Sequence, residues 1–284
     1  MLETAGIHHI SAMVNDAQRT VTFYTGILGV RLVKKTVNYA RPDGYHLYFG
    51  NDAGEPGSII TFFPSANQLR GRIGTGQVGG ISFQIPEGAS TFWEKRLARF
   101  QIAFTTSLRF GERYIKFDDP DGLPIELVEQ REGPRDLMGF GPLDPEVAIT
   151  GLAGATLLSR QPEQTAAMLE GVLGLKKFGQ ERDVLRFQGG AEAGNRIDID
   201  LTAEVRGLMG AGTIHHLAWR RAMKLRLMTG GRSLTTEAII RRRFMTGLIL
   251  KHFIFMRVVA SYLKSPLTLL VLLSMSIGIS LVKG

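Results

Sequence analysis

Apolar and polar positions alternate along residues 5–14 (AGIHHISAMV), the pattern of a strand with one buried face. Asn15 or Asp16 can cap a helix over about residues 17–28, and Gly29 is a typical helix end. Three strand-like runs follow, separated by Gly, Asp and Pro: VRLVKKTV, GYHLYFG and GSIITFFP. This stretch therefore predicts a βαβββ unit.

The same order of elements recurs along the chain. In a second copy, a strand (Gly80–Ile85) and a helix (Ala89–Arg99) precede TTSLRFG, RYIKFDD and LPIELVEQ. In a third, a strand (Thr150–Leu158) and a helix (Pro162–Leu173) precede LKKFGQE, VLRFQG and RIDIDLT. TIHHLAWR opens a fourth copy. The sequence thus predicts four units of about 60–70 residues, starting near residues 7, 80, 152 and 214.

A unit of this size leaves a sheet face exposed, so we expect units to pair and close their sheets face to face. The predicted fold is α+β, with tandem βαβββ units forming paired half-barrels and an incomplete fourth unit, because the repeat stops near residue 222. The Pro- and Gly-rich residues 131–147 predict a linker. The expected organisation is a first domain at 4–130 (units one and two), a second at 148–221 (unit three and the start of unit four), and a tail at 222–284.

Four of the six histidines form two doublets, His8-His9 and His215-His216, in the similar contexts GIHHIS and TIHHLAW. Both doublets lie on the first strand of their unit. Adjacent strand residues point to opposite faces, so we expect one histidine of each doublet to face a given interior. Units one and four would then each contribute one imidazole to a shared site. Two neutral imidazoles suit Fe, Mn, Zn, Ni or Cu, and a carboxylate would complete the facial triad of non-haem Fe(II) oxygenases.

Several segments resemble the ring-cleaving dioxygenases of the vicinal oxygen chelate (glyoxalase/bleomycin resistance) superfamily, above all the branch acting on hydroquinone-type aromatics: GIHHISAMV, FYTGILGVRLVKKTVN, YHLYFG, RFGERYIKFDDPDG and GTIHHLAWR. The resemblance covers about residues 4–221. It implies the vicinal oxygen chelate fold and Fe(II) as cofactor, with Mn(II) as the alternative. It also implies a set of site residues: the metal ligands His9 and His216, with His8, His215 and Ser11 as catalytic residues on the substrate side.

The resemblance further implies a glutamate ligand on the last strand of unit four, and this sequence lacks it. Glu237 is the only acid after residue 221, and no strand-like pattern surrounds it. Glu126, in LPIELVEQ, occupies the corresponding place in unit two, which is the wrong unit for a site shared by units one and four. We therefore expect a two-histidine site without its carboxylate.

Two other motifs are weaker candidates. Residues 74–79 match GxGxxG, but a strand follows where a nucleotide loop needs a helix. His46, in GYHLYFG, is expected to be a packed strand residue rather than a ligand.

Composition narrows the functional classes. The 284 residues are 44% apolar and include no cysteine, which excludes a disordered chain, disulfides, thiolate metal sites and thiol nucleophiles. The N-terminus, MLETAGIHHI, lacks the pattern of a secretory signal. The formal net charge is +8, but residues 222–284 hold ten Lys and Arg against one acid, so the rest of the chain is nearly neutral. Nucleic acid is therefore not an expected partner.

The tail changes character abruptly. Residues 265–282 carry no charge and lie between Lys264 and Lys283, so they predict a marginal membrane span with basic flanks. A one-base frameshift near Arg221 is the alternative. Shifting the frame back permits the fourth-unit motifs that the resemblance implies, in order, with a glutamate codon at position 264.

The resemblance implies a ring-cleaving dioxygenase that inserts O2 into a dihydroxylated aromatic of hydroquinone or catechol type, whereas the residues by themselves predict only a two-histidine site shared by units one and four. Without the carboxylate ligand, we expect this chain to be inactive or severely impaired. The alternatives are a glyoxalase-type metalloenzyme and a metal-free small-molecule-binding protein of the same fold. The expected location is cytoplasmic, with membrane association only through residues 265–282, and a homo-oligomer is compatible with the sequence.

Overall fold

The computed structural model describes residues 4–38, 41–130, 142–221, 255–259 and 269–274. Unit one holds β1 (Thr4–Val14), α1 (Ala17–Val21), the π-helix η1 (Thr22–Ile27), β2 (Arg31–Asn38), β3 (Arg41–Gly50) and β4 (Ile59–Pro64). Unit two holds β5 (Gln77–Pro86), α2 (Ser90–Arg99), β6 (Phe104–Arg109), β7 (Glu112–Asp118) and β8 (Pro124–Gln130). Unit three holds β9 (Gly151–Leu158), α3 (Pro162–Gly171), β10 (Lys176–Glu181), β11 (Val184–Gln188) and β12 (Arg196–Asp200). The α+β fold and the repeat are confirmed.

Local signals explain the helix boundaries. The Asp16 carboxylate caps α1 by accepting a hydrogen bond from the backbone N–H of Arg19 at 2.7 Å. Gly29 ends this helical segment at φ +70°, a conformation that glycine adopts without strain. α3 begins with Pro162 in its first turn, where proline's missing N–H costs nothing.

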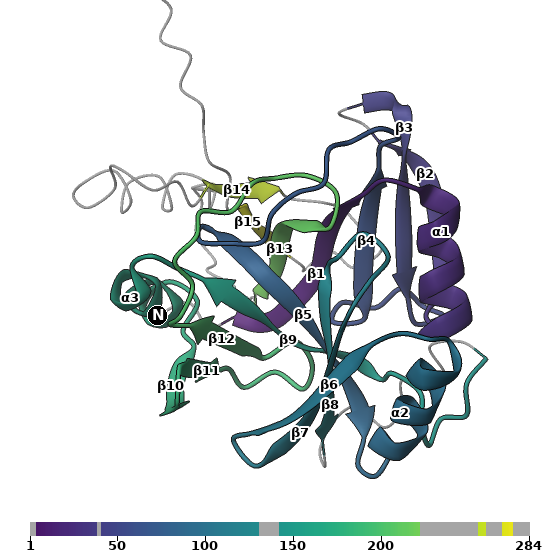
Figure 1. Ribbon diagram of the computed structural model, residues 1–284. Helices are drawn as coiled ribbons and strands as arrows, with labels where there is room; N and C mark the ends of the chain where they lie inside the picture. The colour runs from purple at the N-terminus through teal and green to yellow at the C-terminus, as the bar shows by residue number, and fades with distance from the viewer. Residues whose placement is uncertain (1–3, 39–40, 131–141, 222–254, 260–268, 275–284) are drawn as a thin grey trace, which may run out of the picture.

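The strands form two sheets, each built from two units (Figure 1). The seven-stranded sheet has the order β14-β15-β13-β1-β4-β3-β2 and combines unit one with β13 (Thr213–Arg221) and the two tail strands β14 (Phe255–Val259) and β15 (Leu269–Ser274). The eight-stranded sheet has the order β10-β11-β12-β9-β5-β8-β7-β6 and combines units two and three. Each sheet therefore joins segments from both sides of the predicted linker, of which residues 131–141 lie outside the described part. The domain division proposed from the sequence stays a prediction.

Strand directions follow one rule in the three complete units. The first strand of each unit pairs in parallel with the last, as β1–β4, β5–β8 and β9–β12, and the first strands of paired units meet antiparallel, as β1–β13 and β5–β9. In the tail, β15 pairs with β13 antiparallel. The described tail strands thus cover the edge of β13 without reproducing the parallel strand that would complete unit four.

The two sheets share the same irregularities at their centres. A β-bulge falls at His8 on β1 and another at His215 on β13. In the second sheet the corresponding bulges fall at Gly79 and Ala153. The next residues correspond as well, so Gly80 and Gly154 stand where the first sheet has His9 and His216.

The last strand of each complete unit also has an equivalent position. On the first strand of each unit, the residue two places after the His9 position is Ser11, Ser82 or Thr156. Its register partner on the last strand of the same unit is Thr61, Glu126 or Asp198, respectively. Thr61 in the first sheet therefore stands where the second sheet has two carboxylates. By this register, Thr61 marks a place in the first sheet where an acid is missing.

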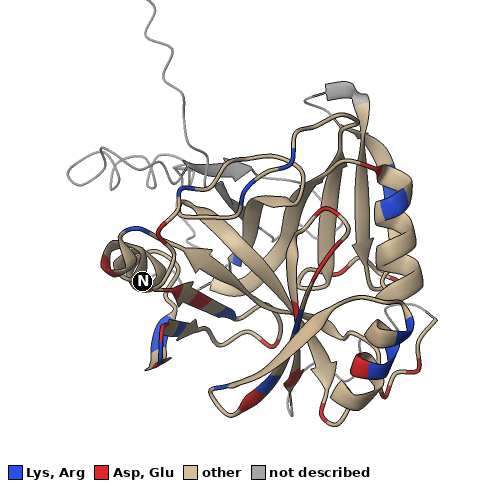
Figure 2. Cartoon of the chain, in the orientation of Figure 1, with Lys and Arg blue, Asp and Glu red and all other residues tan. Residues whose placement is uncertain are grey.

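The core lies where the sheets and helices meet. Its largest fully buried side chains include Trp93, Trp219, Tyr24, Phe49 and Phe62. Charged residues of both signs are interspersed over α2 and the outer strands of the second sheet (Figure 2). Within the described part of the chain, no helix is both long enough and apolar enough to cross a bilayer. Most of residues 265–282, as well as Glu237, lie outside the described residues, and the frameshift stays a prediction.

Candidate metal and substrate site

His9 and His216 lie side by side at the centre of the first sheet. His9 is on β1, and His216 is on the adjacent β13, opposite Ser11. The Nε2 atoms of His9 and His216 are 3.1 Å apart. Their rings meet edge to face, with centroids 5.2 Å apart. The antiparallel pairing of two strands 207 positions apart therefore brings together the two imidazoles expected from units one and four.

The first histidines of the doublets join the same cluster. His8 Nδ1 lies 3.0 Å from His9 Nδ1, and His215 Nδ1 lies 2.8 Å from His216 Nδ1. The expectation that the two members of each doublet point to opposite faces was wrong, because His8 and His215 are the extra residues of the two β-bulges. A bulge interrupts the alternation of faces and re-aims a side chain. The result is a chain of four imidazoles connected through ring nitrogens.

Burial keeps these imidazoles neutral. It lowers the pKa of His9 well below the usual 6.5, and the neighbouring His216 and His8 rings lower it further. Burial, with His215 and His46 nearby, lowers the pKa of His216 to about 3. At neutral pH each ring therefore has one nitrogen lone pair available to accept a hydrogen bond or bind a metal.

Ser11 links the histidine pair to residues of unit one. Its Oγ lies 3.2 Å from His216 Nε2 and 2.6 Å from Thr61 Oγ1, and both hydroxyls are buried. Thr61 Oγ1 is in turn 2.9 Å from His46 Nε2, whose ring also stacks on Phe63 with centroids 4.2 Å apart. Sequence reasoning placed Ser11 on the substrate side but missed Thr61 and the involvement of His46, because only the register of β1, β4 and β3 brings them together.

The imidazole pair fits a divalent transition metal, while the complete ligand set is not present among the described residues. Two nitrogens about 2.1 Å from one ion and at a right angle lie about 3.0 Å apart, close to the observed separation of the Nε2 atoms. In the described ranges no group of three or more His, Asp or Glu side chains is arranged to hold a metal. Two imidazole donors fit, and a carboxylate donor is not found in that part of the chain.

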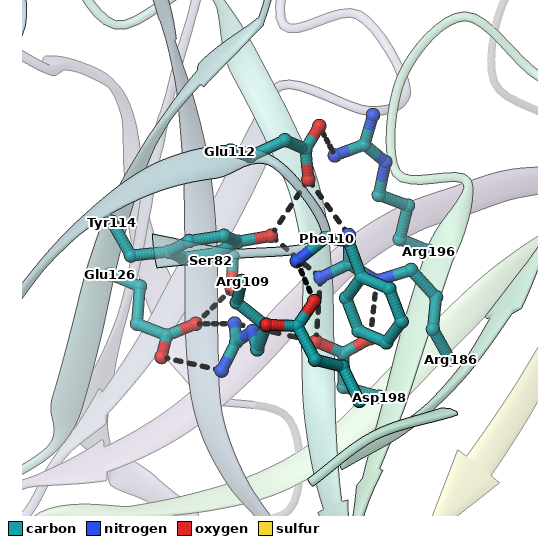
Figure 3. A network of polar contacts seen from close by, with 10 residues as sticks. Ser82, Arg109, Phe110, Glu112, Tyr114, Glu126, Arg186, Arg196 and Asp198 are labelled. Atoms are coloured by element: carbon teal, nitrogen blue, oxygen red, sulfur yellow. Dashed lines mark hydrogen bonds and ion pairs between the residues drawn. The ribbon is translucent and has the colours of Figure 1, made fainter. Parts of the chain in front are cut away.

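Glu126 is engaged in the other sheet (Figure 3). Its carboxylate accepts hydrogen bonds from Arg109 Nη2 at 2.9 Å and from Ser82 Oγ at 2.8 Å. The same Arg109 nitrogen lies 3.3 Å from Asp198, which also forms a bidentate ion pair with Arg186. The second sheet thus holds carboxylates from two last strands, with a guanidinium between them. The second sheet has no histidine at the places of His9 and His216.

Comparisons with known proteins agree with this architecture. Residues 6–127 match the Glyoxalase/Bleomycin resistance protein/Dioxygenase superfamily. The chain is 54% identical over 218 residues to "Putative ring-cleaving dioxygenase MhqO" of Bacillus subtilis, covering 77% of this chain and 70% of that protein. It is 33% identical to "Chlorohydroquinone/hydroquinone 1,2-dioxygenase" of Sphingobium indicum, covering 76% and 70%.

Solved structures give the same result. A crystal structure of a "putative dioxygenase" from Bacillus subtilis superposes with a TM-score of 0.74 at 53% identity, covering 77% of this chain and 71% of that one. Glyoxalase I from Zea mays superposes with a TM-score of 0.56 at 16% identity, covering 75% and 73%, and so shares the fold. With the repeat, the paired sheets and the histidine pair in place, the chain belongs to the glyoxalase/bleomycin resistance protein/dioxygenase superfamily and, within it, to the ring-cleaving dioxygenases.

Proposed function

We propose that this chain is a ring-cleaving dioxygenase acting on a dihydroxylated aromatic of hydroquinone or catechol type, with O2 as co-substrate. His9 and His216 would hold Fe(II), with Mn(II) as the alternative, and the metal would supply the Lewis-acid and O2-activating chemistry. The observation that carries the proposal is the 3.1 Å approach of the two Nε2 atoms. The names of the relatives support the reaction type and the substrate class.

The outer histidines have defined tasks in this proposal. When both Nε2 lone pairs are engaged, His9 carries its proton on Nδ1 and donates it to His8 Nδ1, and His216 does the same toward His215. Each outer ring then fixes the tautomer and orientation of its neighbour. His8 and His215 keep their Nε2–H groups for the substrate, and Ser11 offers a hydroxyl beside His216.

We also propose that this chain is severely impaired as an enzyme. The facial triad needs one carboxylate beside the two histidines, and the described residues provide none that is free to join them. Two neutral imidazoles should hold Fe(II) weakly. This part of the proposal accompanies the predicted frameshift, which sequencing the DNA across codons 218–226 would test directly.

The test measures metal binding and turnover separately. Full-length protein titrated anaerobically with Fe(II) should bind one equivalent weakly through the histidine pair, and His9→Ala or His216→Ala should abolish that binding. Arg113→Ala, a change in an exposed ion pair, is the control and should bind as the wild type does. Fe(II) binding that survives both histidine changes would refute the site.

Oxygen uptake with hydroquinone tests turnover. We expect a rate at least about 100-fold below the roughly 10 per second of an average enzyme. A rate near that average would contradict the impairment.

Hydroquinone binding without metal dependence would favour the metal-free binding protein, and isomerase activity would favour the glyoxalase-type alternative. A cytoplasmic location is part of the proposal, and cell fractionation would test it against membrane association.

A further inference from the structure

His46 belongs to a continuous chain of hydrogen-bonding groups that ends at the histidine pair. Its Nε2 lies 2.9 Å from Thr61 Oγ1, and its Nδ1 lies 2.9 Å from the hydroxyl of Tyr48. Thr61 Oγ1 lies 2.6 Å from Ser11 Oγ, which lies 3.2 Å from His216 Nε2. Every link is short enough for a hydrogen bond, and each group can both donate and accept when the imidazole changes tautomer.

The chain of groups crosses three neighbouring strands from the interior outward. Ser11 on β1 is fully buried opposite the buried Thr61 on β4, and Tyr48 on β3 is the register partner of Thr61. His46 and Tyr48 are half-buried, and the ammonium of the exposed Lys34 lies 5.8 Å from the centre of the Tyr48 ring. The sequence of groups therefore leads from the candidate metal site to the surface beside Lys34.

We infer, on the basis of the proposed function, that Ser11, Thr61, His46 and Tyr48 form a proton relay for a hydroxyl group of the aromatic substrate. The substrate O–H bond breaks as its proton passes to Ser11, the Ser11 proton passes to Thr61, and the Thr61 proton passes to His46 Nε2. His46 then releases its Nδ1 proton to Tyr48, whose own proton passes to water. One proton has moved from substrate to solvent, the substrate is left as a phenolate, and all four side chains return to their neutral forms.

Only Ser11 would touch the substrate, so the other three are positioning residues that act through it. Burial, with the nearby charge of Lys34 and the His215 ring, lowers the pKa of His46 to about 4. A neutral imidazole at physiological pH can receive a proton on one nitrogen while releasing one from the other, and a low pKa means that it does not retain the proton. The stacking of His46 on Phe63 is compatible with this role, since it occupies the face of the imidazole ring and leaves both ring nitrogens, at the ring edge, to Thr61 and Tyr48.

Thr61 is the link to test, because valine has the same shape without the hydroxyl. Thr61→Val interrupts the relay, and Thr61→Ser restores it. Thr75→Val is the matched control, because Thr75 is also buried but its hydroxyl has no hydrogen-bond partner among the described residues. The readout is the nitrogen NMR spectrum of the full-length, metal-free protein labelled at histidine, with hydroquinone as the probe.

In the ligand-free protein, Thr61→Val should shift the resonances of both His46 and His216, while Thr61→Ser and Thr75→Val should leave them in place. Addition of hydroquinone should shift the His46 resonances in the wild type and in Thr61→Ser but not in Thr61→Val, which should still bind with affinity reduced no more than about fivefold. Equal His46 shifts in Thr61→Val and wild type would overturn the relay. The proposed function would instead be overturned if the ligand-free spectra supported the relay but the His9 and His216 resonances did not shift on addition of hydroquinone.

Discussion

The register of the two sheets identifies a place where a carboxylate can be added to the first sheet. Thr61 stands where the second sheet has Glu126 and Asp198, and both of those carboxylates reach a single guanidinium nitrogen, at 2.9 and 3.3 Å. Carboxylates at this register thus converge on one cation. We expect Thr61→Glu to place a carboxylate beside the His9–His216 pair and so to complete a set of two histidines and one carboxylate.

The expected gain follows from the ligand count. Loss of even an outer partner of a metal-binding histidine costs about 10–100-fold in metal affinity, so a direct anionic ligand should contribute at least about 100-fold. Thr61→Gln is the matched control, since it has the same shape without the charge. Thr61 is fully buried, so both variants should also lose about 1–3 kcal/mol of stability through overpacking, which a folded protein of this size can tolerate.

Titration calorimetry with Mn(II), on protein shown by circular dichroism to be folded, measures the difference. Thr61→Glu should bind at least about 100-fold more tightly than Thr61→Gln, and the added His216→Ala change should remove the gain. Equal affinities in Thr61→Glu and Thr61→Gln would refute the register argument. A gain that survives His216→Ala would show that the new carboxylate binds metal elsewhere.

Three further predictions concern stability. Burial lowers the pKa of His8 and of His46 from 6.5 to about 4, so the unfolded chain binds more protons than the native chain below pH 6.5. The free energy of unfolding, measured with urea, should therefore be largest above pH 6.5 and fall progressively toward pH 4. The fall should be shallower in His8→Gln. Arg109→Ala leaves Glu126, whose side chain is only 12% exposed, without its main partner and should cost about 3–5 kcal/mol. The more exposed pair of Arg113 and Glu94 should contribute less than about 1 kcal/mol, and similar losses in the two variants would contradict the burial argument. A Cβ at Gly154 would meet the Arg196 carbonyl oxygen 2.3 Å away, so Gly154→Ala should lower the melting temperature clearly, while Gly171→Ala, with open space around it, should lower it little or raise it.

The repeat, the βαβββ order of elements within units and the meeting of His9 with His216 could be predicted because they depend on periodic patterns and on a doublet that recurs at equivalent places. The orientation of His8 and His215 could not, because a β-bulge is a property of two paired strands and neither doublet signals it alone. The roles of Thr61 and His46 were hidden for a related reason. A threonine and a histidine in alternating strands are typical packed residues, and only the pairing of β4 with β1 and β3 connects them to Ser11. The tail could be recognised as a departure from the repeat, yet the antiparallel pairing of β15 with β13 follows no pattern in the first three units.

The pairing of β1 with β13 has a consequence for how the protein is made. A ribosome must synthesise more than two hundred residues after His9 before the strand carrying His216 exists, while β5 and β9 are available to each other much earlier. Closure of so long a loop is slow, so β1 should wait with one edge unpaired while the second sheet is already formed. During that interval the unpaired edge of β1 is open to pairing with another copy of the chain, and a metal held by both histidines can bind only after residue 216 has been synthesised.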